Sequence, residues 1–353
     1  MASSRVIGLD IGSSAVRAAE LEFGGGARSG KSSPGLARVG EVPLPVGAVR
    51  DGEVVQPETV SHAIRQLWSR GKFESKDVVL GVGNQRVLVR ELDLPWMPLP
   101  QLRASLPFQV GEMLPMSADE ALLDFFASGE VDGAQGRMLR GMLVAAQRDT
   151  VTANVLAVES AGLRPIMVDL NGFALLRALA RGDLARATAA FVDIGATITT
   201  VAIATGGLPR LVRSLPSGGQ HVTNAVASIL NVSLPEAENL KREVGVGFAV
   251  APDRQPAAEA IGTVVRTLVE GIRNTFVYFQ SNNPGASIDV VVLTGGGAQL
   301  PGLGQYISSA TRLPATLGNP IAMLRQGRGT RDLPLGHESL LALSVGLAYG
   351  VAA

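Results

Sequence analysis

The sequence predicts an α/β protein of two lobes built on a duplicated strand-turn-strand unit, because one short pattern occurs in each half of the chain. In residues 5–22 an apolar run leads into Asp10, one apolar residue and Gly12, and a second apolar run follows. Asp193 and Gly195 stand in the same arrangement further along. The length of 353 residues is typical of about two domains.

Each copy of the pattern predicts a buried strand that carries a carboxylate to its tip, followed by a turn in which glycine allows backbone angles forbidden to other residues. Such a turn can bind phosphate through clustered backbone N–H groups, with small hydroxyl residues as further donors. Asp10 and Asp193 would then face each other, hold Mg²⁺ through water as hard oxygen ligands do, and take part in any catalysis. The residues expected around the anion are Gly12, Ser13, Ser14, Arg17, Gly195, Ala196 and Thr197.

A third glycine motif follows a predicted strand that begins at residue 289, at Gly295, Gly296 and Gly297. Such a turn lets the backbone pack flat against a planar ligand. Two Asp-x-Gly hairpins followed by this turn resemble the actin-like ATPases, a family with a duplicated ribonuclease H-like fold that includes actin, the heat-shock chaperone ATPases, sugar kinases and FtsA. The resemblance spans nearly the whole chain. It implies ATP as the cofactor, with the hairpins at the phosphates and the glycine turn at the adenosine.

Two further stretches are candidates for nucleotide contact, and each has a plainer explanation. A helix predicted over residues 216–230 begins with paired glycines whose backbone donors suit phosphate, or which form a flexible cap. The helix that follows, at 234–243, carries a carboxylate and two cations one turn apart, a spacing that resembles the adenosine-contacting helix of the chaperone ATPases and also suits an ion-paired surface. The residues concerned are Gly218, Gly219, Glu238, Lys241 and Arg242.

Asp169 lies between a predicted strand and a helix predicted over residues 173–184. The actin-like families often place an acidic or amide group here, where it orients water near the γ-phosphate, and this resemblance makes Asp169 a catalytic candidate. The alternative is a helix N-terminal charge that complements the helix dipole. Both interpretations stay open at this point.

Residues 86–160 predict a small α+β module inserted into the first lobe, which occupies residues 1–85 and resumes over 161–187. The second lobe is expected over 188–335, with 220–283 as its smaller subdomain, and residues 336–353 form a helix that returns to the first lobe. Gly346 in that helix permits a close helix crossing. An insertion at this point is found in FtsA and in the PilM family of type IV pilus assembly proteins. The stretches that resemble the PilM family are 46–53, 90–95, 114–116, Asp124 and 168–179.

Composition excludes several other classes. Lys+Arg and Asp+Glu both number 31, so no net field favours nucleic acid or an anionic membrane. The chain has no cysteine, and its three histidines are scattered, which excludes disulfides and His/Cys metal sites. Mean hydropathy is +0.25, but no apolar run of about 18 residues is free of charge, and no signal peptide opens the chain. We therefore expect a cytoplasmic protein without a transmembrane segment.

Residues 25–32 match the P-loop pattern letter for letter. A working P-loop must open a helix whose N-terminus faces the phosphates. Pro34 and Gly35 follow at once, and the next residues resemble a strand. We therefore interpret this stretch as a flexible loop between two strands.

Resemblance to the PilM family implies an ATP-binding platform protein of type IV pilus assembly, peripheral to the inner face of the cytoplasmic membrane. It would hold the N-terminal cytoplasmic peptide of the inner-membrane protein PilN between the inserted module and the first lobe, alongside other platform components and possible self-association. ATP would set lobe closure with at most slow hydrolysis. The alternatives are an FtsA-like division filament protein, which would need a C-terminal amphipathic membrane helix, and a small-molecule kinase, which would need polar groups converging on an acceptor hydroxyl.

Overall fold

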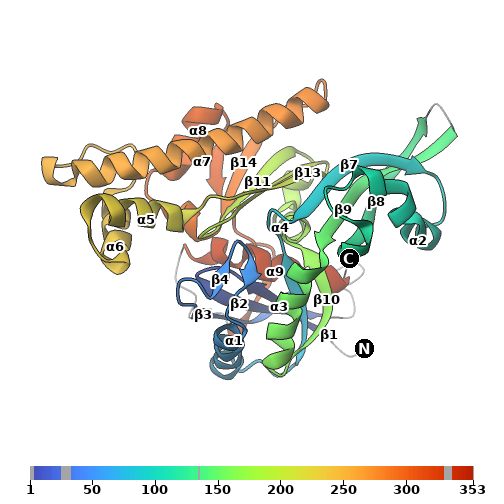
Figure 1. Cartoon of the computed structure of the whole chain (residues 1–353), viewed down its shortest axis with the longest axis horizontal. Helices are drawn as coiled ribbons and strands as arrows, with labels where there is room; N and C mark the ends of the chain where they lie inside the picture. Colours follow the sequence, from blue (N-terminus) through green and yellow to red (C-terminus); the bar gives the residue numbers. More distant parts are fainter. Residues whose placement is uncertain (1–3, 25–32, 134–135, 330–335, 353) are drawn as a thin grey trace.

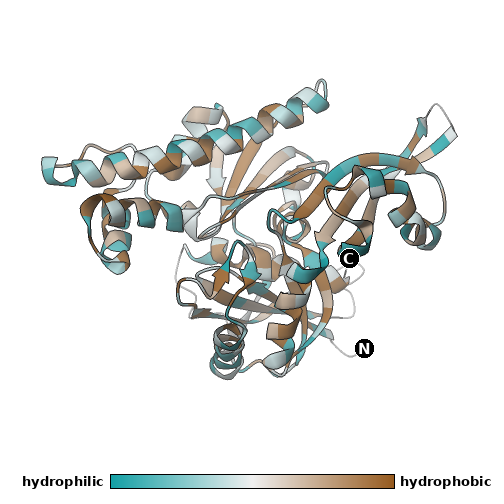
Figure 2. Ribbon diagram, viewed as in Figure 1, coloured by the Kyte–Doolittle hydropathy of each residue, from teal (hydrophilic) through white to brown (hydrophobic). Residues whose placement is uncertain are grey.

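The computed structural model describes residues 4–24, 33–133, 136–329 and 336–352. The P-loop-like stretch at 25–32 lies outside the described residues. Two large mixed sheets form the two lobes, and a smaller sheet projects from the side of the molecule (Figure 1). Apolar residues concentrate on the strands and on the helix faces turned toward them (Figure 2).

The first sheet has the strand order β10-β6-β1-β2-β3-β16. A hairpin of β1 and β2 forms its centre, β3 continues the antiparallel run, and β6 and β10 add parallel strands on the other side of β1. The sequence predicted residues 188–335 as the second lobe, a range that includes β16. In the structure β16 pairs with β3 and so belongs to the sheet of the first lobe. The strands are β1 (Ser4–Ile11), β2 (Ala15–Phe23), β3 (Gly35–Pro43), β6 (Asp77–Val82), β10 (Arg164–Leu170) and β16 (Arg325–Gly329).

The second sheet has the order β13-β12-β11-β14-β15 and repeats five of the six strands of the first, with no counterpart of β16. Strands β11 and β12 form the central antiparallel hairpin, β13 extends it, and β14 and β15 run parallel to β11. The duplication of one short motif in the sequence therefore corresponds to a duplication of five strands of the sheet. The strands are β11 (Thr188–Ile194), β12 (Thr199–Thr205), β13 (Leu208–Leu215), β14 (Val290–Thr294) and β15 (Ala315–Leu317).

The smaller sheet has the order β7-β9-β8 and lies within the residues predicted as an inserted module. It comprises β7 (Val87–Pro95), β8 (Ala121–Gly133) and β9 (Gly136–Gln147), and helix α2 (Leu99–Val110) packs on it. Leu102, Leu106 and Phe125 form the buried centre of its own small core. Helix α3 (Arg148–Ser160) falls inside the same predicted range but packs against α1 and β10 of the first lobe.

Helices cover the two large sheets, and the long helix α7 lies along the second lobe (Figure 1). Pro107 lies inside α2. The remaining helices are α1 (Pro57–Gly71), α4 (Asn171–Leu179), α5 (Gly219–Leu230), α6 (Leu234–Val244), α7 (Gln255–Asn282), α8 (Leu303–Thr311) and α9 (Ala342–Ala348). Short pieces are the hairpin β4 (Val49–Arg50) and β5 (Glu53–Val54) and the 3₁₀ turns η1 (Gly111–Met113), η2 (Ala118–Glu120), η3 (Gly182–Ala185), η4 (Pro252–Arg254), η5 (Gly296–Gln299), η6 (Glu338–Leu341) and η7 (Gly350–Ala352).

Helices α4 and α9 join the two lobes through one shared core. Leu175 of α4, Phe191 of β11 and Leu347 of α9 are fully buried in the same cluster. The two helices cross closely because Gly346 has no side chain. A Cβ on Gly346 would lie 1.8 Å from the carbonyl oxygen of Ala174.

We predict that Gly346→Ala destabilises the protein, because its methyl group forces α4 and α9 apart at a cost of about 1–3 kcal/mol. Gly262→Ala is the matched control, because Gly262 is also helical and a Cβ there meets no atom within 4 Å. This control should gain about 0.5–1 kcal/mol from reduced backbone entropy. Urea denaturation of both variants tests the prediction, and equal stability of the two would contradict it.

Candidate functional site

The tips of the two central hairpins meet across the lobes. The hydroxyls of Ser13 and Thr197 lie 2.7 Å apart, within hydrogen-bonding distance, although the residues are separated by 184 positions. Each tip follows a buried strand whose last residues include the aspartate of the motif. The structure thus brings together the two turns that the sequence singled out.

Both aspartates are buried, and each is 8% exposed. Burial raises the pKa of Asp10 to about 6, and the charges of Asp193 and Glu41 add to this while Arg17 opposes it. Burial also raises the pKa of Asp193, against a hydrogen bond from Thr294 (2.8 Å) and the charge of Arg17. Two carboxylates therefore repel each other in a poorly solvated place, which favours a bound cation.

The donor set at this place fits Mg²⁺. Carboxylate oxygens are hard ligands, and Mg²⁺ usually keeps several waters while it binds one or two carboxylates and phosphate. Across the described ranges, no group of three or more His, Cys, Asp or Glu side chains could hold a metal by itself. Asp10 and Asp193 would hold the ion, and its chemistry there would be to neutralise phosphate charge.

Arg17 lies opposite Asp10 in the register of β1 and β2. Its Nε donates to Glu41 at 2.6 Å, so the guanidinium is fixed between a surface carboxylate and the buried one. Gly12 closes the turn by donating its N–H to Ala15 at 3.0 Å. Ser14 is exposed, and its carbonyl accepts from Leu44. The guanidinium of Arg17 thus stabilises the ionised carboxylate of Asp10 in the same hairpin.

The N-terminus of α5 binds the second hairpin rather than leaving its donors free. The N–H of Gly219 donates to Gly195 at 2.9 Å, and the N–H of Gln220 donates to Ala196 at 2.7 Å. The N–H of Gly218 donates to Nδ1 of His221. The backbone N–H groups of Gly218 and Gly219 thus have partners within the protein, and the start of α5 holds the hairpin turn in place.

Lys241 is buried and points from α6 toward the start of α5. Its Nζ donates to the carbonyl of Gly219 at 3.2 Å and forms an ion pair with Glu238 at 2.6 Å. Burial alone would raise the pKa of Glu238, but hydrogen bonds from Lys241, Thr223 and Arg242 outweigh it and lower that pKa. Arg242 is exposed and binds the other oxygen of Glu238. The carboxylate and the two cations therefore act as one unit.

The glycine turn after β14 packs on the second hairpin. Gly295 adopts a φ of +83°, which favours glycine. A Cβ on Gly297 would lie 2.4 Å from Cγ2 of Ile194, so glycine allows close backbone approach there. Gly296 lies beside Leu340. Gly195, Gly219, Lys241 and Gly297 come from four separate segments and converge in one place.

Asp169 is not part of this cluster. One oxygen of its carboxylate accepts from the N–H of Leu170, and the other pairs with Arg177. In the described part of the chain no hydrogen bond or ion pair joins Asp169 to Asp10 or Asp193. Burial and the neighbouring Arg181 lower the pKa of Arg177 to about 10.

Sequence reasoning missed Asn171, two residues further on. It is the first residue of α4, and its Oδ1 is buried without a hydrogen-bond partner among the described residues. The side chain lies beside Gly81 and Gly83, at the end of the strand next to β1. Asp169 and Asn171 both lie at the start of this helix in the sequence. The amide of Asn171 could therefore have been proposed as the water-orienting group alongside the acid.

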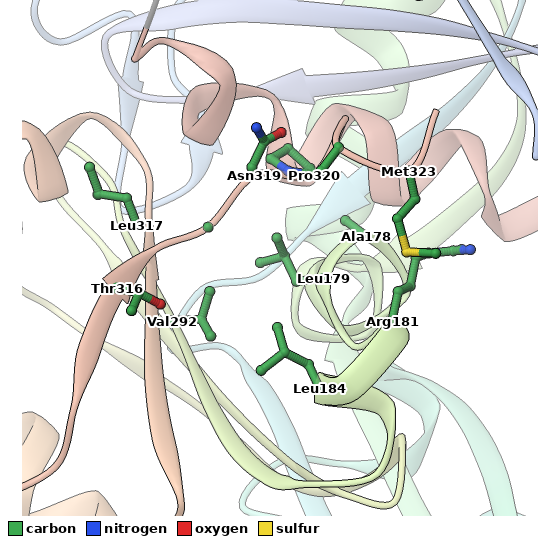
Figure 3. Close-up of a pocket in the computed structure, with 12 residues that line it drawn as sticks. Ala178, Leu179, Arg181, Leu184, Val292, Thr316, Leu317, Asn319, Pro320 and Met323 are labelled. Carbon is green, nitrogen blue, oxygen red and sulfur yellow. The ribbon is translucent and has the colours of Figure 1, made fainter. Parts of the chain in front are cut away.

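A small cavity lies apart from the hairpins, between the end of α4, β14 and residues 316–323 (Figure 3). Its volume is about 190 Å³, and its walls are mainly apolar, as Leu179, Leu317 and Met323 illustrate. None of the predicted site residues lines it.

Two sheets that share the order of five strands, two aspartate-tipped hairpins whose tips meet, and a glycine turn beside the second hairpin define the actin-like ATPase fold. The structure of MreB5 of Spiroplasma citri bound to AMPPNP shares this fold, with a TM-score of 0.52 and 15% identity over 97% of this chain and 94% of that one. A family model described as type IV pilus assembly protein PilM matches residues 8–351. The chain belongs to the PilM family.

Two further comparisons agree with this assignment. A chain of the solved PilM-PilN type IV pilus biogenesis complex is 25% identical, with a TM-score of 0.83 over 99% of this chain and 98% of that one. Cell division protein FtsA of Bacillus subtilis (strain 168) is 20% identical over 266 residues, or 69% of this chain. The match spans 58% of the FtsA sequence. Among the described helices, none is long and apolar enough to cross a membrane.

We predict that the Asp10 contribution to the stability of the metal-free protein falls as the pH rises from about 4 to about 6, because folding raises the pKa of Asp10 from 3.8 to about 6. The folded state then holds a proton that the unfolded state has released, and ionisation at higher pH removes this advantage. Asp10→Asn should abolish this component, so its stability relative to wild type rises across the window. Urea denaturation at several pH values measures the difference.

Asp77→Asn is the control for this experiment. A hydrogen bond from Arg164 lowers the pKa of Asp77, so its contribution is present at neutral pH and is lost as the pH falls. The sign of its pH dependence is therefore opposite. A stability difference for Asp10→Asn that does not vary with pH would contradict the buried, coupled carboxylate.

Proposed function

We propose that this protein is an ATP-binding component of type IV pilus assembly that holds the N-terminal cytoplasmic peptide of a PilN-like inner-membrane protein. Family membership supports the first half, and the PilN component of the related solved complex supports the second. The observation that carries the nucleotide part is the meeting of the two hairpin tips beside the buried, coupled carboxylates of Asp10 and Asp193.

The polyphosphate would lie between the hairpin turns, with Mg²⁺ on the two aspartates. The backbone N–H groups and hydroxyls of the turns supply donors, and Arg17 adds a fixed cation. The adenosine would lie against Gly295–Gly297, with Glu238 and Lys241 next to it, because these residues converge beside the second hairpin. A nucleotide analogue bound to MreB5 of Spiroplasma citri supports this use of the fold.

The proposal includes slow hydrolysis. A rapid ATPase needs a base or an oriented water in line with the γ-phosphate. Asp169, the acid expected to orient such a water, is engaged by Arg177. Nucleotide would therefore act by setting the distance between the lobes rather than by rapid turnover.

We predict that Asp10→Ala lowers ATP·Mg²⁺ affinity roughly 10- to 100-fold, because it removes one of two groups that position the metal. Asp77→Ala, in the same sheet but paired with exposed Arg164, should bind as wild type does. Isothermal titration with ATP in the presence and absence of Mg²⁺ tests this. Unchanged affinity in Asp10→Ala would sink the proposed site.

The partner peptide would bind at the free edge of β10, beside the inserted module. In the described part of the chain β10 pairs only with β6, so its other edge offers unpaired backbone groups. This strand also exposes Ile166 (47%), Met167 (41%) and Val168 (36%). An extended peptide can add to such an edge through main-chain hydrogen bonds, with apolar side chains giving specificity. The module contributes exposed Phe126, whose ring contacts Phe173 at the start of α4.

Membrane location would follow from this contact. A peptide of an inner-membrane protein holds the chain at the inner face of the cytoplasmic membrane without a span of its own. Other components of the inner-membrane platform, and further copies of this chain, would then meet at the same place. These partners belong to the proposal through family membership alone.

We predict that Val168→Glu weakens binding of a synthetic PilN N-terminal peptide about tenfold or more, because it places a charge in an apolar contact. Ile229→Glu is the control, since Ile229 is 61% exposed on α5 of the second lobe. Fluorescence anisotropy of a labelled peptide measures both. No binding by wild type, with or without ATP, would remove the partner from the proposal, while equal loss in both variants would move the contact elsewhere.

A further inference from the structure

We propose that Arg210 fastens the inserted module to the second lobe, so that entry of nucleotide between the lobes resets the surface that binds the partner peptide. This inference rests on the proposed function and supplies a device for its regulation. The module, taken here as β7, β8, β9 and α2, is inserted into the first lobe by sequence. The structure ties it to the second lobe as well.

The guanidinium of Arg210 makes this connection through hydrogen bonds to two residues. Arg210 lies on β13, and its Nε donates to Oε1 of Glu91 on β7 at 3.0 Å. Its Nη2 donates to Oδ1 of Asn283, just after α7, at 2.5 Å. The side chains of Arg210 and Glu91 are 29% and 24% exposed, so the pair is largely shielded from solvent. A planar guanidinium held on two sides transmits displacement better than a flexible ammonium would.

The contact joins the edges of two different sheets. Strand β13 is the edge of the second-lobe sheet, and β7 is the edge of the module sheet. The two strands lie side by side (Figure 1), and they pack against each other. A movement of the second lobe therefore reaches β7 first.

The module is also held to the first lobe. Strand β7 follows β6 after a short turn in which Asn84 is buried and donates to Glu53 at 3.2 Å. Helix α3, which follows β9, packs on α1, and its Thr150 donates to the same carboxylate at 2.7 Å. A body tied to both lobes has to shift relative to at least one of them whenever the lobes move.

Phosphate that enters between the lobes has to displace the contact of the two hairpin tips. The hydroxyls of Ser13 and Thr197 are 2.7 Å apart, so a phosphate group that binds between them breaks their hydrogen bond. In this proposal the nucleotide also parts the tips and carries β13 away from its present place. Arg210 conveys this displacement to β7, and the module then shifts against β10, which belongs to the first-lobe sheet. Phe126 of the module and exposed Val168 of β10 are thus placed differently with and without nucleotide.

A charge-swap experiment tests the device. The dissociation constant of a synthetic PilN N-terminal peptide is measured with and without ATP·Mg²⁺ for wild type, Arg210→Glu, Glu91→Arg and the double swap. We expect nucleotide to change the constant at least about fivefold in wild type, a size typical of coupling between two sites. Each single variant should bring the ratio close to one, because it sets like charges against each other. The double swap should restore the ratio.

Arg213→Glu is the matched control, because Arg213 lies on the same strand and its side chain is exposed without a hydrogen bond or ion pair to any described residue. It should keep the wild-type ratio. Glu91→Gln keeps the size and removes only the charge, so it reports on the ion pair if a charge reversal fails to fold. Thermal melting followed by circular dichroism confirms that each variant is folded.

A second readout does not depend on the peptide. Amide hydrogen exchange across β7 should change on addition of ATP·Mg²⁺ in wild type and in Arg213→Glu, and it should not change in Arg210→Glu. If the peptide binds no variant but this exchange pattern holds, the partner is wrong and the fastening by Arg210 stands. If wild type binds peptide equally with and without nucleotide, or if folded single variants keep the wild-type ratio, the fastening is overturned.

Discussion

Two buried carboxylates that repel each other are the constraint on which the rest of the structure depends. Asp10 and Asp193 come from different lobes, and each is carried to its place by a strand with neighbours on both sides. Burial makes both charges costly, and the coupling between them raises the cost further. Under the proposed function a cation and an anion would share the site and offset this cost.

The surrounding elements hold the two carboxylates in place and do not relieve their repulsion. The amides at the start of α5 bind the carbonyls of the second hairpin, and the glycine turn after β14 packs on the same hairpin. Lys241 closes the group from the side of α6 through the carbonyl of Gly219. Several glycines that would suit a bound ligand are already required by these close backbone contacts. The two requirements are compatible, because a rigid turn is also a better phosphate site.

Movement between the lobes is limited by two kinds of contact. The apolar core shared by α4 and α9 is continuous across both lobes, so separating the lobes there would expose apolar surface. The hairpin tips and Arg210 are polar contacts outside that core, and they can exchange partners at modest cost. A continuous apolar core with polar contacts outside it suits the proposed change of shape in response to a nucleotide.

The sequence by itself determined the duplicated hairpins, the position of their aspartates and the presence of an inserted α+β segment, because local patterns of apolar residues, glycine and carboxylate specify strands and tight turns. It also carried the resemblance that the family match confirms.

Only the tertiary structure decided which donors are free, since the partners of Gly219 and Gln220 lie more than 20 residues away along the chain. The same holds for Asp169 and Asn171. Both stand at one helix start, but the neighbouring Arg177 engages the acid while the amide oxygen stays unpaired, and side-chain direction at a strand-helix junction depends on packing that no local pattern encodes. The link from Arg210 to Glu91 spans 119 positions and exists only because two sheet edges meet in space.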